Sequence, residues 1–218
     1  MNVIIKLGGS LLAKGREIVR FLRDYAEKKT VFFIIIPGGG PFVEAIRELS
    51  ERRTISKDAA HWMAVLAMHQ YGFFLADGET AIPLVESMEE LSDTGHICIV
   101  LPYQILKADD SLPHTWDVTS DTIAAFIAHK LGEKRFIKVT DVDGILDENG
   151  SLIKQIHAKE LIEKENKGCI DAELPRFLMR NKMSCVIVNG NFPERIIDVI
   201  EGRETVCTSI FHVGLRPM

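Results

Sequence analysis

The sequence predicts an α/β fold, a three-layer αβα sandwich with a largely parallel central sheet. Two apolar runs, 3–5 and 31–36, each lead into glycines. Neither run alternates with polar residues, which is typical of strands buried on both faces of a parallel sheet. The segment between them, 16–29, is amphipathic, so the three form a strand–helix–strand unit. Strand-like and helix-like segments alternate along the rest of the chain, which favours this layered arrangement.

The remaining elements follow from periodicity and from capping residues. Residues 42–52 place apolar side chains on one helical face behind Pro41, which suits a first helical turn. Residues 57–76 are rich in Ala, Met and Leu, which predicts a long helix buried on more than one side. Residues 122–131 predict a helix that ends at Gly132. Further helices are expected at 158–164, 174–182 and 193–200, and further strands at 97–101, 135–140, 184–188 and 208–212.

Composition excludes several classes of protein. At 218 residues, 46% of them hydrophobic, the chain can bury a substantial core. The net charge of −5 argues against a nucleic-acid partner. No apolar run reaches the roughly 18 residues of a membrane span, and the N-terminus does not resemble a signal peptide. The cysteines lack metal-ligand spacing, so we expect buried thiols of a cytoplasmic protein, at positions 98, 169, 185 and 207.

The first glycine loop, Lys6-Leu7-Gly8-Gly9-Ser10, indicates a phosphate site. Glycines let the backbone approach an anion with its N–H groups, and Lys6 adds a positive charge. Taken alone, such a loop after a strand is more often just a turn. A second loop, Pro37-Gly38-Gly39-Gly40, follows the next strand. Both loops are expected at the same edge of the sheet, where α/β proteins bind ligands, and neither matches a P-loop or a dinucleotide fingerprint.

Two further loops, 141–144 and 189–191, also follow predicted strands. In chain order, Asp117 and Asp121 lie between the two glycine loops and these two later loops. Backbone donors, a lysine and carboxylates are the groups that phosphoryl transfer requires, because the protein's task there is to place charge and orient the reactants. Structural alternatives remain for individual residues. Asp121 could cap its helix, and Asp143-Gly144 could form only a turn.

Four motifs in order resemble the amino acid kinase family: Lys-Leu-Gly-Gly-Ser at 6–10, Pro-Gly-Gly-Gly at 37–40, Thr-Ser-Asp-Thr at 119–122, and Lys-Val-Thr-Asp-Val-Asp-Gly-Ile at 138–145. The family includes acetylglutamate, aspartate, carbamate, uridylate and isopentenyl phosphate kinases. The resemblance covers nearly the whole chain. It implies a single domain with an acceptor-binding lobe at about 1–110 and a nucleotide-binding lobe at about 111–218, ATP and Mg²⁺ as cofactors, and a homo-oligomer.

The resemblance also implies roles for individual residues. Lys6 would contact the transferred phosphoryl group, and Asp121 would organise the catalytic lysines, with Asp117 one helical turn before it. The nucleotide would be bound by Gly8, Gly9, Ser10, Thr140, Asp141, Gly144 and Ile145. The acceptor would be bound by Gly38, Gly39, Gly40, His61, Trp116 and Asp117. No protein ligands for a metal ion are expected.

One motif departs from the family pattern. Many members carry a second lysine in a Gly-Gly-Met-x-x-Lys motif, and here the corresponding region is Gly168-Cys169-Ile170-Asp171-Ala172-Glu173. The position of that lysine falls on Glu173. Lys167 is a candidate replacement, although a solvated surface lysine is an equally good interpretation.

The acceptor is suggested by two sets of residues. His61 stands where uridylate kinase has a substrate-binding acid, and in isopentenyl phosphate kinase a histidine of this region contacts the substrate phosphate. His61 could therefore gain charge beside a phosphate, or it could be a buried structural histidine. His114 and Trp116 offer an aromatic wall, and Asp117 could pair with an amine. This combination favours a small, flat, amine-bearing phosphorylated acceptor.

Two rival functions remain open from the sequence. An isopentenyl phosphate kinase would need a deep apolar tunnel near Phe73 and Phe74. A non-catalytic sensor or storage protein that binds a nucleotide or another small ligand is suggested by the missing lysine at Glu173. The apolar helix at 57–76 favours a homo-oligomer in either case.

Overall fold

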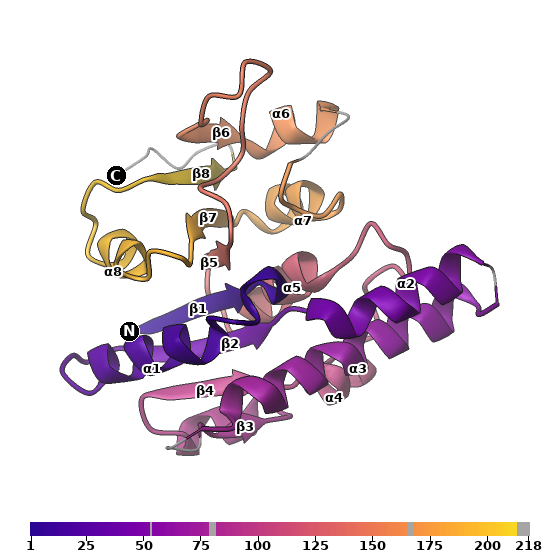
Figure 1. Cartoon of the computed structure of the whole chain (residues 1–218), viewed down its shortest axis with the longest axis horizontal. Helices are drawn as coiled ribbons and strands as arrows, with labels where there is room; N and C mark the ends of the chain where they lie inside the picture. The colour runs from indigo at the N-terminus through magenta and orange to yellow at the C-terminus, as the bar shows by residue number, and fades with distance from the viewer. Residues whose placement is uncertain (53, 79–81, 165–167, 213–218) are drawn as a thin grey trace.

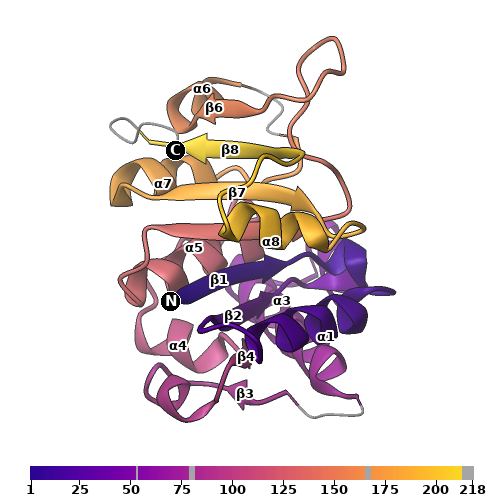
Figure 2. The ribbon, with the colours of Figure 1, turned by 90° about the vertical axis from the view of Figure 1, so that its left-hand side faces the viewer.

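The computed structural model describes residues 1–52, 54–78, 82–164 and 168–212. Within these residues one sheet has eight strands in the order β3-β4-β2-β1-β5-β7-β8-β6, and Figure 2 shows them stacked in this order. The strands are β1 (Asn2–Leu7), β2 (Phe32–Pro37), β3 (Leu84–Val85), β4 (Ile97–Val100), β5 (Arg135–Thr140), β6 (Gln155–His157), β7 (Ser184–Asn189) and β8 (Cys207–Phe211).

The sheet is largely parallel, as the sequence predicts. Of the neighbouring pairs, β7 and β8 alone run antiparallel within the described residues, and the arrow of β8 points against that of β7 in Figure 2. Strand β6 is parallel to β8, so these two strands share the reversed direction. The other six strands run in one direction, and their carboxyl ends therefore lie at one edge of the sheet. The glycine loops that follow β1 and β2 therefore meet at that edge.

Both faces of the sheet are covered, which explains why its strands are apolar throughout. Along β2, Phe33 and Ile35 belong to one buried cluster, whereas Ile34 and Ile36 belong to another. Successive side chains point to opposite faces of a strand, so the two clusters are the two interfaces of a three-layer sandwich. The predicted fold class is confirmed.

The helices divide between these two interfaces. Helices α1 (Gly15–Ala26) and α8 (Glu194–Ile200) contribute to the cluster that contains Phe33, and α4 (Tyr103–Ala108), α5 (Ser120–Lys130), α6 (Ala158–Glu163) and α7 (Leu174–Asn181) contribute to the other. The long helix α3 (Lys57–Ala76) contributes to both, which explains its width of apolar coverage. Short 3-10 helices lie at η1 (Gly9–Leu11), η2 (Gly40–Val43) and η3 (Glu89–Asp93).

Helix α2 (Glu44–Glu51) packs on α3 beyond the second glycine loop, and both helices are visible at the right of Figure 1. A small separate cluster joins them, with Ile46 on α2 and Ala60 and Ala67 on α3, and Trp116 packs against it. This cluster lies outside the two main cores. It supports the wall of the site described below.

The predicted elements are all present, and some others were not predicted. The helix at 57–76 and the strand at 135–140 match the structure to the residue. Helix α4 and the two short strands β3 and β6 were not predicted. All four cysteines are free; Cys98 and Cys185 are buried as predicted, whereas Cys169 and Cys207 are only partly buried. Among the described residues, no helix combines the length and apolarity needed to span a membrane.

Candidate active site

Two buried lysines share one carboxylate at the centre of the site. Lys6 on β1 and Lys138 on β5 are register partners in neighbouring parallel strands, so their side chains leave the same face of the sheet. Asp121, in the first turn of α5, lies 2.9 Å from the Lys6 ammonium and 2.5 Å from the Lys138 ammonium. The exposed fractions are 6% for Lys6 and 3% for both Lys138 and Asp121. The three form a buried Lys–Asp–Lys triad.

Charge in this triad is unevenly balanced. Burial raises the pKa of Asp121, but Lys138 and Lys6 outweigh it, so the pKa lies well below its usual range. Burial lowers the pKa of Lys138, yet Asp121 more than reverses this effect. For Lys6, burial prevails and the pKa is lowered, with the charge of Lys138 adding to the effect. Two ammonium groups beside one carboxylate leave an excess of positive charge, which an anion bound next to Lys6 would neutralise.

Asp171 fixes the position of the triad from the segment before α7. Its carboxylate accepts hydrogen bonds from the backbone and the hydroxyl of both Thr119 and Thr122, at 2.6 to 2.9 Å. Its own backbone N–H donates to Asp121 at 3.2 Å. The first turn of α5 is thereby held against this segment, and the direction of the Asp121 side chain is fixed with it. Thr119 occupies the N-cap position of α5, so Asp121 is not the N-cap residue.

The two glycine loops touch through their backbones beside Lys6. A Cβ atom added to Gly9 would lie 2.1 Å from the Cα of Gly40, and one added to Gly38 would lie 2.8 Å from the backbone nitrogen of Gly9. Gly40 also has a φ of +57°, which favours glycine. Only residues without side chains allow this approach. The loops form one continuous floor between β1 and β2.

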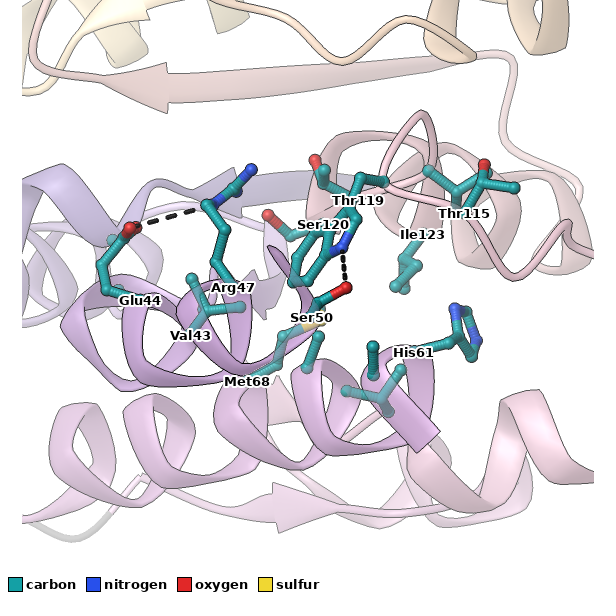
Figure 3. Close-up of a pocket in the computed structure, with 18 of the residues that line it drawn as sticks. Val43, Glu44, Arg47, Ser50, His61, Met68, Thr115, Thr119, Ser120 and Ile123 are labelled. Carbon is teal, nitrogen blue, oxygen red and sulfur yellow. Dashed lines mark hydrogen bonds and ion pairs between the residues drawn. The ribbon is translucent and has the colours of Figure 1, made fainter. Parts of the chain in front are cut away.

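A cavity of about 1060 Å³ opens above this floor. Figure 3 shows Glu44 and Arg47 on its α2 wall, His61 on its α3 wall, and Thr119 and Ser120 on the opposite side. Most of the predicted acceptor residues line it, namely Gly39, Gly40, His61, Trp116 and Asp117, and so do Gly9 and Ser10, which were assigned to the nucleotide.

Arg47 is a cavity residue that the sequence analysis did not identify. Its guanidinium lies 4.6 Å from the centroid of the Trp116 ring, and Trp116 in turn donates to the Ser50 hydroxyl at 2.9 Å. The ion pair of Arg47 with Glu44 is long, at 3.8 Å. A guanidinium carries five N–H donors, so Arg47 retains donors for an anion in the cavity.

The structure bears on two acceptor-side predictions, those for His61 and Asp117. Burial and the neighbouring His114 lower the pKa of His61 to about 4, which favours the neutral ring when no phosphate is bound. Asp117 is not one helical turn before Asp121, because α5 begins only at Ser120. Asp117 lies in the preceding loop with an exposed side chain, and its backbone carbonyl accepts a hydrogen bond from Glu173.

The loop after β5 lies on the other side of the triad. Its predicted nucleotide residues remain together: the Thr140 hydroxyl donates to Asp141 at 3.2 Å, and hydrogen bonding from Ser10 and Thr140 outweighs burial and lowers the pKa of Asp141. Gly144 and Ile145 pack against β8. The backbone N–H of Ile145 donates to the Thr208 hydroxyl at 3.0 Å, and a Cβ on Gly144 would lie 2.2 Å from that hydroxyl.

The carboxylates of this loop provide no complete metal cage. Asp143 is already held by Arg195 at 2.7 Å and by the amide of Asn189 at 2.9 Å. Among the described residues, no group of three or more His, Cys, Asp or Glu side chains could hold a metal ion. Mg²⁺ in phosphoryl-transfer sites usually needs only one or two carboxylates, because substrate phosphates and water complete its shell.

The departure at Glu173 has a structural explanation. Its carboxylate is buried and pairs with Arg180 at 2.7 Å and Arg176 at 3.9 Å, both on α7. This position therefore carries an ion pair with the helix and no cation for a phosphate. Lys167, the candidate replacement, lies outside the described residues. The second lysine of the triad is Lys138, which stands in the fourth sequence motif but had no predicted role.

Comparison with known proteins places this fold and site in one enzyme class. A family model described as the amino acid kinase family matches residues 1–189. The chain therefore belongs to the amino acid kinase family, and its relatives are phosphotransferases.

Several relatives match almost the full length of the chain. It is 32% identical over 215 residues to the [5-(aminomethyl)furan-3-yl]methyl phosphate kinase of Methanocaldococcus jannaschii, a match that covers 95% of this chain and 96% of the relative. It is 26% identical to the uridylate kinase of Methanobrevibacter smithii, with 94% and 96% covered. The crystal structure of uridylate kinase from Archaeoglobus fulgidus superposes with a TM-score of 0.70 at 21% identity, covering 96% of this chain and all of that one.

Proposed function

We propose that this protein is an ATP-dependent kinase that converts a small phosphorylated acceptor into a diphosphate. One observation carries the proposal. The buried Lys–Asp–Lys triad lies beside the glycine floor, and the same floor lines a cavity large enough for a small acceptor. In the proposed reaction an oxygen of the acceptor phosphate bonds to the γ-phosphorus of ATP. The bond from that phosphorus to its bridging oxygen breaks, and ADP leaves with the electron pair.

Each member of the triad has a distinct task in this proposal. Lys6, at the end of β1, neutralises negative charge on the transferred phosphoryl group. Lys138 supplies the second positive charge, from β5 instead of the family motif near α7. Asp121 holds both ammonium groups in place, so little reorganisation is needed when charge moves during transfer. Lys6 and Asp121 keep the roles expected from the sequence, and Lys138 joins them.

The residues present fit a nucleotide with Mg²⁺. The triad carries two ammonium groups and one carboxylate, and this net positive charge suits a polyphosphate. Gly9 has no side chain, so a phosphate can come close to its backbone. ATP supplies the phosphoryl group, and Mg²⁺ neutralises part of the charge on its phosphate oxygens. We propose that the first glycine loop and the loop after β5 hold the nucleotide, through Gly8, Gly9, Ser10, Thr140, Asp141, Gly144 and Ile145.

The acceptor cavity contains complementary charges for a phosphate and an amine. We propose that Arg47 binds the acceptor phosphate above the backbone of Gly39 and Gly40. Asp117 lines the same cavity with an exposed carboxylate, and it pairs with the amine. Trp116, which is fixed by Ser50, offers a flat apolar surface between them.

These features favour [5-(aminomethyl)furan-3-yl]methyl phosphate, an acceptor in methanofuran biosynthesis, as the substrate. It has a phosphate, a flat ring and an amine, and a relative covering 95% of this chain carries its name. The main rival, isopentenyl phosphate, is disfavoured by the position of the two phenylalanines on α3. Phe74 packs under Arg16 at 4.2 Å, Phe73 is 57% exposed, and neither lines the cavity.

Three wider expectations stay as proposals. We propose an acceptor lobe at about 1–110, with residues 114–120 and 123 of the nucleotide lobe completing the acceptor cavity. A homo-oligomer is consistent with the exposed Leu66 and Phe73 on α3 and can be tested by light scattering. A cytoplasmic location is consistent with the free cysteines.

The proposal is tested with a panel of acceptors. Purified protein, ATP and Mg²⁺ are incubated with the aminomethylfuran phosphate, isopentenyl phosphate, UMP or acetylglutamate, and ADP release is measured. We expect the highest kcat/KM with the aminomethylfuran phosphate and its loss in Lys6→Ala. Preference for isopentenyl phosphate would overturn the assignment of substrate. A lack of turnover with every acceptor would instead support a non-catalytic binding protein.

Variants of the cavity separate the two charge contacts. Arg47→Gln should raise the KM for the acceptor roughly 10- to 100-fold, because it removes a hydrogen bond between charged groups, and should leave the KM for ATP unchanged. Arg52→Gln is the matched control, since Arg52 is an exposed arginine at the end of the same helix. Equal KM values in the two variants would exclude Arg47 from acceptor binding.

A further inference from the structure

A histidine beside the acceptor cavity is held between two carboxylates. The Nδ1 atom of His114 lies 2.8 Å from Asp58, and its Nε2 atom lies 2.8 Å from Asp110. Asp58 belongs to the first turn of α3, and Asp110 follows α4 in the chain. Ionised carboxylates only accept hydrogen bonds, so both contacts can form together only when both ring nitrogens carry protons. The geometry therefore selects the positively charged form of His114.

The other groups around His114 also come from α3 and α4. The His61 ring stacks on it, with centroids 4.1 Å apart and planes inclined by 12°, and the Trp62 ring meets its plane edge-on at 5.3 Å. Lys107 lies over Trp62 at 4.0 Å. The titratable and charged neighbours are thus Asp58, Asp110, His61 and Lys107.

His114 lies in the loop that forms one wall of the cavity. Residues 115–118 of this loop line the cavity, and Trp116 and Asp117 are among them. One attachment fixes the loop to α2, through the hydrogen bond from Trp116 to Ser50. The contact of His114 with Asp58 is a second attachment, to α3. Both attachments span the space between the loop and the helices on which the acceptor would lie.

We propose that His114 is a positioning residue whose charged ring fastens the 109–119 loop to α3, so that loss of its proton loosens the cavity wall and weakens acceptor binding. The part that concerns the acceptor rests on the proposed function. The fastening itself is a property of the fold. Since the loop also bears Asp117, the effect falls on the acceptor more than on the nucleotide.

The pH dependence has a defined direction. Burial lowers the pKa of His114, but Asp110 and Asp58 outweigh it, so the pKa lies above the ordinary value of 6.5. The attachment is therefore complete below about pH 6.5 and is lost as the pH rises through the higher pKa of the folded protein.

Hydrogen–deuterium exchange of the full chain measures the fastening without any substrate. After correction for the intrinsic pH dependence of exchange, the 109–119 segment should be protected at pH 6 and progressively exposed towards pH 9. His114→Gln should remove this protection at pH 6. His96→Gln is the matched control, because His96 is exposed in the turn before β4 and should change nothing. Unchanged exchange of this segment in His114→Gln would overturn the proposal.

Steady-state kinetics tests the consequence for binding. At pH 6, His114→Gln should raise the KM for the acceptor roughly fivefold, as expected for a partly exposed ion pair, with kcat and the KM for ATP unchanged. The ratio of the KM of His114→Gln to that of the parent protein should approach one at pH 9. Because both proteins bind the same acceptor, this ratio cancels the effect of the acceptor's own titration. A constant ratio, or an unchanged KM at pH 6, would refute the positioning role.

Asp58→Asn provides a second variant that alters the attachment from the other side. It should also reduce protection at pH 6, and combining it with His114→Gln should add little, because both remove one contact. Additive effects would contradict the proposal. If protection changes as expected while no acceptor is turned over, the fastening stands and the proposed function fails.

Discussion

Replacement of Lys138 by methionine tests whether the second buried lysine is catalytic. The change removes the charge that lies 2.5 Å from Asp121 and largely preserves the side-chain volume. Losing one partner of a buried ion pair typically costs about 3–5 kcal/mol. Asp121 keeps Lys6 at 2.9 Å and the N–H of Asp171 at 3.2 Å, so we expect the lower end, about 3 kcal/mol. This corresponds to a fall in Tm of about 6–12 °C for a chain of this size.

The expected effect on catalysis is separate from the effect on stability. Removing one group that stabilises charge in a transition state typically lowers kcat by about 10²–10³-fold. We therefore expect such a fall for Lys138→Met at a temperature at which the variant is fully folded, with the KM for ATP changed only a few-fold. Lys134→Met is the control, because Lys134 is an exposed lysine just before β5. The assay is ADP release under saturating substrates, beside thermal melts followed by circular dichroism.

The outcome that refutes this reasoning is specific. If Lys138→Met loses stability as expected but retains kcat within about threefold of the parent protein, Lys138 only holds Asp121 in place. Lys6 would then be the single catalytic cation. Retention of both stability and kcat would contradict the electrostatic description of the triad itself.

Two further predictions concern the glycine floor and acid stability. Gly9→Ala places a methyl group 2.1 Å from Gly40, which should separate the two loops, lower the free energy of unfolding by roughly 1–3 kcal/mol and abolish most turnover. Gly78→Ala is the control in the same thermal melts and activity assays, because Gly78 lies in open space. Equal stability and turnover in the two variants would exclude a steric role for Gly9. The lysines hold the pKa of Asp121 below its ordinary 3.8, so their stabilisation is present above that pH and lost as the pH falls further. Urea unfolding between pH 5 and pH 2 should therefore show a steeper loss in the parent protein than in Asp121→Asn, and parallel curves would disprove this.

Elements with a strong periodic pattern were predictable, and short peripheral ones were not. The helix α3 has a serine N-cap at Ser56 and a long apolar surface, so its bounds follow from local chemistry. The strands β3 and β6 contain only two and three residues. Such strands exist because a neighbour offers hydrogen bonds at the edge of the sheet, which no local pattern reveals. The antiparallel direction of β8 is likewise set by tertiary packing.

The site shows the same division between local and tertiary information. Lys6 was recognisable because it stands beside glycines, whereas Lys138 lies inside an apolar strand. A lysine in a strand buried on both faces is itself a signal, since its charge needs a partner. Identifying that partner required the register of β1 and β5 and the position of α5. Arg47 had the pattern of an ordinary surface arginine, and only the approach of Trp116 distinguishes it.

The hydroxyl of Thr208 ties the loop after β5 to a strand beyond the part of the chain that the family model matches. That match ends at residue 189, whereas Thr208 lies on β8, fully buried, and donates to the carbonyl of Ile153 while it accepts from Ile145. The conformation of the 138–145 motif thus depends on β8, a strand that lies outside the residues matched by the family model. Relatives that differ only in this last strand can therefore differ in how they hold the same loop, with every motif residue unchanged.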